Sequence, residues 1–107
     1  MMKKIEQVDQ FDQLLTKGDP FFFFKHSLTC PISASAYKEF SQFAKNNEEV
    51  ETYYLAVQES RELSSRIAEQ HGVRHESPQV FFFKEGKPIW HTSHNKIKEQ
   101  TLKEQME

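Results

Sequence analysis

Two runs of phenylalanine dominate the hydrophobic pattern of the chain. Residues 21–24 and 81–83 are all phenylalanine, so an extended segment at either place has no polar face to turn toward water. Such runs are typical of strands buried on both sides. We therefore predict strands at Phe21–His26 and Gln79–Lys84. A third strand is predicted at 50–57, which is rich in β-branched and aromatic residues.

Apolar residues at helical spacing occur in the segments before and after these strands. Apolar residues in 31–46 recur every three or four positions, which predicts an amphipathic helix ending near Asn46. An earlier helix is expected from Asp9, as N-cap, to Gly18. Residues 5–8 are expected to form a short edge strand, and a single helix starting at Ile5 is nearly as good an interpretation.

The second half of the chain continues the alternation of predicted strands and helices. Ser60 and Gly72 are suitable ends for a third helix. Glu85 and Gly86 predict a hairpin turn leading into a fourth strand at 87–92, and Pro88 places that strand at an edge. A weakly apolar last helix is expected to follow, with Ser93 or Asn95 as its cap and Ile97, Thr101, Leu102 and Met106 on its apolar face.

This order of elements predicts one α/β domain over residues 1–107. The strand–helix–strand unit made by residues 21–57 should be parallel and right-handed. The closing hairpin is antiparallel within itself. The expected architecture is a four-stranded mixed sheet, with a possible extra N-terminal edge strand, and with helices on both faces.

Composition and charge narrow the classes of function. A formal net charge of −2 does not suggest a nucleic-acid partner. One cysteine cannot form an internal disulfide, and no stretch has the length needed to cross a membrane. The first residues contain lysines but no apolar segment of the kind that a signal peptide has. We therefore expect a cytoplasmic protein with a reduced thiol.

That thiol, Cys30, is the strongest candidate for chemistry. It lies between a buried strand and a helix that starts with Pro31, where the helix dipole stabilises a thiolate. Ser27, Thr29 and Ser33 make the surroundings polar, which favours a nucleophile over the alternative, an inert buried cysteine.

Ser33 follows Cys30 by one helical turn. Its hydroxyl can face the sulfur and donate a hydrogen bond to the thiolate, although an ordinary first-turn serine is an equally good interpretation. A dithiol oxidoreductase would have its resolving cysteine at this position. Any mixed disulfide on Cys30 therefore requires a second molecule for its release.

The histidines give a weaker signal. None of the five pairs with another at a spacing of four residues on one helix, and we expect no metal site. His94, between Ser93 and Asn95 at the expected start of the last helix, could bind an anion.

Several short motifs resemble those of a known family. They are Thr29-Cys30-Pro31-Ile32-Ser33, Glu76-Ser77-Pro78-Gln79 and Ser93-His94 with Ile97. Together with the predicted topology they resemble the thioredoxin superfamily and, more closely, the monothiol bacilliredoxins of the bacillithiol system. The resemblance covers essentially the whole chain and implies a thioredoxin-like fold.

The resemblance also implies an activity. Cys30 would attack the mixed disulfide between bacillithiol and a client protein's cysteine, take up bacillithiol and free the client thiol. No cofactor would be bound, and an external thiol or reductase would recycle Cys30. The site would include a cis Pro78 beside Cys30 and contacts from Thr29, Pro31 and the Ser77 backbone. By position, the carboxylates of bacillithiol would meet Ser93, His94 and Asn95.

Two other classes of function also fit the sequence. One is a non-catalytic thioredoxin-fold adaptor with an incidental cysteine. The other is a peroxide-reducing thiol that forms a sulfenic acid. No arginine is adjacent to Cys30 in the sequence to stabilise a peroxide, although Arg61, Arg66 or Arg74 could approach it in the fold.

Overall fold

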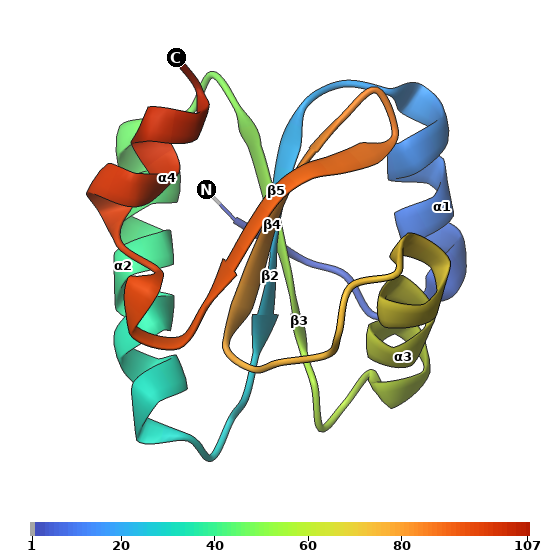
Figure 1. Cartoon of the computed structure of the whole chain (residues 1–107), viewed down its shortest axis with the longest axis horizontal. Helices are drawn as coiled ribbons and strands as arrows, with labels where there is room; N and C mark the ends of the chain where they lie inside the picture. The colour runs from blue at the N-terminus through green and yellow to red at the C-terminus, as the bar shows by residue number, and fades with distance from the viewer. Residues whose placement is uncertain (1) are drawn as a thin grey trace.

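The computed structural model describes residues 2–107 and forms three layers, with a central sheet between two pairs of helices (Figure 1). The elements in chain order are β1 (Lys3–Lys4), α1 (Val8–Lys17), β2 (Phe21–His26), α2 (Pro31–Asn46), β3 (Glu51–Ala56), α3 (Arg61–His71), β4 (Gln79–Lys84), β5 (Lys87–Ser93), a 3-10 turn η1 (His94–Lys96) and α4 (Glu99–Gln105). Helices α2 and α4 cover one face of the sheet, and α1 and α3 cover the other.

The sheet has five strands in the order β1-β3-β2-β4-β5. Strands β1, β3 and β2 are mutually parallel, whereas β4 runs antiparallel to both β2 and β5. The predicted α/β class, the mixed sheet and the extra N-terminal strand are therefore confirmed. Strand β5, which carries Pro88, lies at an edge as expected.

The phenylalanine runs form the middle of the sheet. Because successive side chains of a strand point to opposite faces, Phe21 and Phe23 pack with α1 and α3, whereas Phe22 and Phe24 pack with α2 and α4. Rings also meet across the β2–β4 pair. The Phe22 and Phe82 rings are stacked with centroids 4.3 Å apart, directly opposite each other in the register. Two aromatic cores, one on each face, hold β2 rigidly in place.

The boundaries of the terminal elements differ from those expected. The edge strand is Lys3–Lys4 rather than 5–8, and the first helix begins at Val8 with Gln7, not Asp9, as its N-cap. The Gln10 side chain accepts a hydrogen bond from the Gln7 backbone N–H at 3.1 Å, which fixes this earlier start. A single helix from Ile5 is thereby ruled out.

The start of the last helix was also wrongly predicted. Residues His94–Lys96 form a 3-10 turn, and α4 begins only at Glu99. A carboxylate oxygen of Glu39, on α2, accepts the Glu99 backbone N–H at 2.8 Å and so caps α4 from outside.

Among the described residues, no helix combines the length and the apolar character needed to span a membrane.

The β4–β5 hairpin offers a test of this packing. Gly86 has φ +76°, and a Cβ placed on it would lie 3.0 Å from the Leu15 carbonyl oxygen of α1. Gly72 has a similar φ of +64° but open space around it. We expect Gly72→Ala to destabilise the fold by about 1 kcal/mol through backbone strain alone, and Gly86→Ala by about twice as much. Urea unfolding of both variants measures the difference, and equal losses would contradict the close approach of α1 to the hairpin.

Candidate functional site

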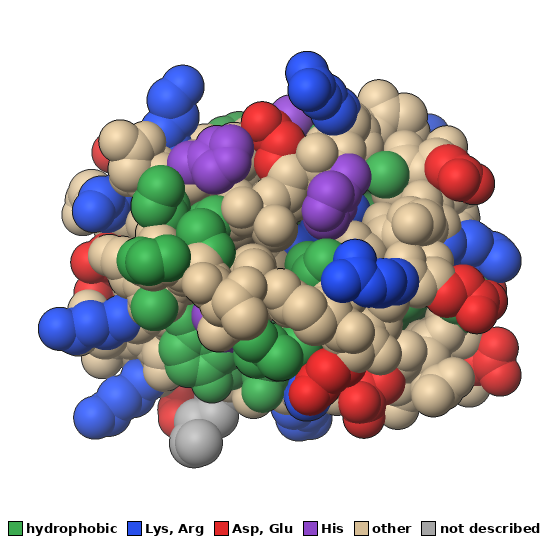
Figure 2. Space-filling view, turned by 90° about the horizontal axis from the view of Figure 1, so that it is seen from below, with side chains coloured by type: hydrophobic (Ala, Val, Ile, Leu, Met, Phe, Trp, Pro, Cys, Tyr) green, Lys and Arg blue, Asp and Glu red, His purple; other side chains and the backbone are tan. Residues whose placement is uncertain are grey.

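The topology brings the predicted site residues to one end of the sheet. Cys30 follows the C-terminal end of β2, and Pro78 precedes β4, which runs antiparallel to β2. Ser93 ends β5, where it lies opposite Gln79 in the register. The end of β3 reaches the same place because β3 is parallel to β2. This end is at the bottom of Figure 1 and faces the viewer in Figure 2.

Cys30 is the N-cap residue of the 16-residue helix α2 and is partly exposed. A partly exposed thiol at a helix N-terminus combines access with the favourable end of the helix dipole. Its neighbours Leu28 and Ile32 are 52% and 49% exposed. Exposed apolar side chains therefore occur two residues before and two residues after Cys30 in the chain, and exposed apolar surface of this kind is suited to contact with a larger partner. Thr29 and Pro31 are exposed as well.

Ser33 is fully buried and its hydroxyl has two partners. The oxygen accepts the Ser27 backbone N–H at 2.8 Å and lies 2.8 Å from His26 Nδ1. Burial lowers the pKa of His26, and the neutral ring that this favours can accept the hydroxyl proton. Ser33 thus ties the first turn of α2 to the end of β2. Among the described residues no hydrogen bond joins Ser33 to Cys30, and the hydroxyl has one proton, so the predicted donation to the thiolate requires that its bond to His26 be broken.

Gln58, which the sequence analysis did not single out, holds the loop before Cys30. Its Oε1 accepts the Leu28 backbone N–H at 3.0 Å, and its Nε2 donates to Ser27 Oγ at 3.0 Å and to Thr29 Oγ1 at 3.5 Å. One side chain from the β3–α3 connection therefore holds three successive residues of the loop. No motif marks this role, because it depends on the parallel alignment of β2 and β3.

The second loop of the site contains a cis peptide bond between Ser77 and Pro78, as the family resemblance implies. The fully buried Gln79 side chain shapes this loop, because it accepts the Glu76 backbone N–H at 3.3 Å and donates to the Arg74 carbonyl at 3.1 Å. Within residues 2–107, the Ser77 backbone has no hydrogen-bond partner. Its predicted pairing with an extended substrate is untested.

Residues Ser93, His94 and Asn95 lie beside this loop. The His94 backbone N–H donates to the Pro78 carbonyl at 2.9 Å, and η1 packs against α2. However, Ser93 caps only the three-residue 3-10 turn η1, and the last α-helix, α4, begins at Glu99. The expected helix N-terminus at 93–95 is therefore wrong. Their predicted contact with a ligand's carboxylates loses that support and stays a prediction.

Lys25 is a second residue that the sequence analysis missed. It lies on β2, fully buried among phenylalanines, on the face opposite Ser33. Its ammonium donates to the Ser64 carbonyl at 2.9 Å and lies 3.3 Å from His75 Nδ1. Burial lowers the pKa of Lys25 to about 8. It also lowers the pKa of His75, and the nearby charge of Lys25 adds to that effect.

Two of the three arginines considered for peroxide stabilisation, Arg61 and Arg66, lie on α3, whereas Arg74 follows it in the loop before Pro78. Arg66 pairs with Asp12 of α1 at 3.3 Å. Arg61 lies beside Val57, Ser64, Ser65 and His75 around a hollow of about 170 Å³. None of these contacts joins an arginine to Cys30.

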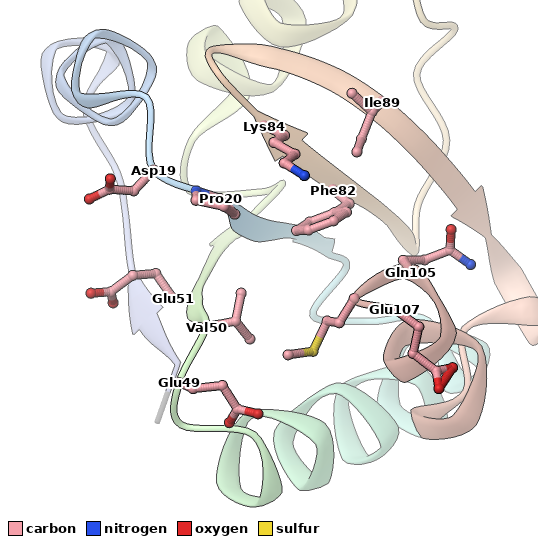
Figure 3. A pocket seen from close by; sticks show the side chains of 11 residues that line it. Asp19, Pro20, Glu49, Val50, Glu51, Phe82, Lys84, Ile89, Gln105 and Glu107 are labelled. Carbon is pink, nitrogen blue, oxygen red and sulfur yellow. The ribbon is translucent and has the colours of Figure 1, made fainter.

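A larger hollow of about 580 Å³ lies at the opposite end of the sheet (Figure 3). Asp19 and Pro20 precede β2, Glu51 starts β3 and Lys84 ends β4. The thiol lies at the other end of these strands, so this hollow takes no part in the chemistry of Cys30. In the part of the chain that the structure covers, no cluster of three or more His, Cys, Asp or Glu side chains is placed to hold a metal ion.

A cysteine at the N-terminus of the helix after a central strand, together with a cis-proline before the antiparallel strand, defines a thiol protein of the thioredoxin fold. Solved structures agree. A thioredoxin-fold protein described as a candidate oxidoreductase is 40% identical, with a TM-score of 0.92 over 99% of this chain and 94% of its own. Fasciola hepatica thioredoxin is 20% identical, with a TM-score of 0.77 over 98% and 96%. Malassezia sympodialis thioredoxin is 21% identical, with a TM-score of 0.77 over 98% and 89%.

The model of the family described as monothiol bacilliredoxin BrxC matches residues 3–102. The chain belongs to this family. The resemblance found in the motifs is thereby confirmed, and family and fold together support a thiol redox role.

Proposed function

We propose that the protein is a monothiol thiol–disulfide oxidoreductase that removes bacillithiol from S-bacillithiolated proteins. The observation that carries the proposal is a single, partly exposed cysteine at the N-terminus of α2, at the same end of the sheet as the cis-proline loop. Family membership supports bacillithiol as the small thiol.

The proposed step exchanges one disulfide bond for another. The Cys30 thiolate attacks the bacillithiol sulfur of the mixed disulfide. A bond forms between Cys30 and bacillithiol while the bond to the client sulfur breaks. The client cysteine leaves as a thiolate and takes a proton from water. A second exchange, with an external thiol, removes bacillithiol from Cys30 as a new disulfide and restores the thiolate.

The surroundings of Cys30 suit this step. Leu28 and Ile32, two positions before and after Cys30 in the chain, offer exposed apolar surface to a client protein. The unpaired Ser77 backbone offers one donor and one acceptor to an extended segment. Ser33, in place of a second cysteine, leaves no internal thiol to displace the adduct.

Intact-mass spectrometry tests the proposal directly. The reduced protein is mixed with a bacillithiolated client, and we expect the client to lose one bacillithiol mass while the chain gains it on Cys30. A Cys30→Ser protein is the control for transfer to other residues. Parallel reactions with mixed disulfides of other small thiols measure the preference for bacillithiol. If the client keeps its adduct in the presence of the wild-type protein, the proposal fails.

A further inference from the structure

The hollow beside α3 is lined by hydrogen-bond donors and one cation, Arg61, and by no acid. Its walls are Val57, Arg61, Ser64, Ser65 and His75. Arg61 and Ser65 are exposed and both lie in the first half of α3. None of the salt bridges formed within residues 2–107 involves Arg61. Figure 2 shows a histidine next to a basic side chain on the half of this end that carries α3.

The buried ammonium of Lys25 lies directly behind this wall. It contacts two of the lining residues, through the Ser64 carbonyl and His75 Nδ1. No carboxylate pairs with it among the described residues, although buried charges normally have such a partner. Phe81, whose ring centroid is 5.6 Å from Nζ, gives only a weak cation–π contact. The positive charge is therefore left without a counter-ion at the base of the hollow.

Lys25 also determines which ring nitrogen of His75 carries the proton. An ammonium group can only donate, so His75 Nδ1 must accept, and a neutral ring then carries its proton on Nε2. With Nδ1 turned toward Lys25, the Nε2–H is the donor on the outer side of this exposed ring. The hollow thus offers the imidazole N–H, the Arg61 guanidinium and the Ser65 hydroxyl. Glu76 acts electrostatically on His75 but does not line the hollow.

We propose that this hollow, between Arg61 and His75 and backed by Lys25, binds a carboxylate group of the small thiol that Cys30 takes up. The proposal rests on the thiol-exchange function above. A volume of about 170 Å³ suits a fragment of a small molecule rather than a peptide segment. Two lining residues are close in sequence to the loops of the thiol site: Val57 precedes Gln58, which bonds to Thr29, and His75 lies two residues before the Ser77–Pro78 peptide bond.

Binding of the carboxylate alone is the first test. Succinate, with neutral succinamide as the matched probe, is titrated into the full chain and followed by amide NMR. We expect saturable shifts at Arg61, Ser64, Ser65 and His75 with succinate only. Arg61→Gln should weaken binding about tenfold, as for the loss of one charged hydrogen bond. Arg66→Gln, on the same helix but paired with Asp12, should leave it unchanged.

The second test measures whether the carboxylate site affects the rate of thiol–disulfide exchange. Oxidised glutathione and its ethyl ester differ in carboxylate charge but contain the same disulfide. We expect the wild-type protein to react faster with the free acid than with the ester. Arg61→Gln should lower the ratio of the free-acid rate to the ester rate about tenfold, without changing the rate with the ester. Absence of saturable succinate shifts, equal shifts with succinamide, or an unchanged ratio would overturn the carboxylate site. Failure of the wild-type protein to take up bacillithiol from a bacillithiolated client in the intact-mass test would instead refute the exchange function.

Discussion

Replacement of Cys30 by serine is expected to lower the rate of bacillithiol release from a client protein by at least about 10³-fold, the scale of loss that removal of a nucleophile causes. Serine keeps the size and the N-cap position of the side chain, so the loop and α2 should stay in place. A neutral hydroxyl is a weak nucleophile, and the chain has no other cysteine to replace the lost thiol.

The measurement is the second-order rate constant for loss of the adduct from the client, with circular dichroism to confirm the fold of the variant. Binding of the variant to a client is measured separately. A non-catalytic adaptor would keep both its binding and its biological role in Cys30→Ser. A rate within tenfold of the wild-type value would mean that Cys30 is not the nucleophile.

The buried Lys25 should make the stability of the fold rise with pH. Its pKa is about 8 in the folded protein and 10.5 in the unfolded chain. Between these values the unfolded state holds more protons than the native state, so the free energy of unfolding increases as the pH rises. From pH 7 to 9.5 the gain from this one group is about 2 kcal/mol.

Lys25→Met isolates this contribution. Methionine has a similar length and no charge, so the variant loses the pH-dependent gain together with the contacts to Ser64 and His75. We expect the stability difference, wild type minus variant, to rise by about 2 kcal/mol between pH 7 and 9.5 in urea unfolding. Titrating groups that do not contact Lys25 cancel in this difference, and His75 adds little above pH 7 because its pKa is already lowered by burial. The exposed Lys84, replaced in the same way, is the control. If the stability difference between wild type and Lys25→Met does not change with pH, burial does not lower the pKa of Lys25 in the folded protein.

The central elements were predictable because their residues have few alternatives. A run of four phenylalanines fits only a strand covered on both sides, and a proline after Cys30 fits the first position of a helix. The bounds predicted for β2, α2 and β4 therefore agree with the structure. These elements place Cys30 and the cis-proline loop, so the main part of the candidate site followed from the sequence.

The terminal elements and the support of the site depend on contacts that a sequence does not show. The start of α4 is fixed by Glu39, sixty positions earlier in the chain. The role of Gln58 needs the alignment of β2 with β3, and the burial of Lys25 needs α3 and His75 packed over it. Spacing within a segment gives no information on such long-range partners.

The position of β2 between β3 and β4 has a consequence for motion. A central strand with an aromatic core on each face exchanges its amide protons only when the whole domain opens, whereas short edge elements fray far more often. Cys30 follows directly from that most persistent strand, while η1 and the seven-residue α4 lie on the periphery. The sulfur is therefore expected to keep a fixed position even when short peripheral elements such as η1 open locally.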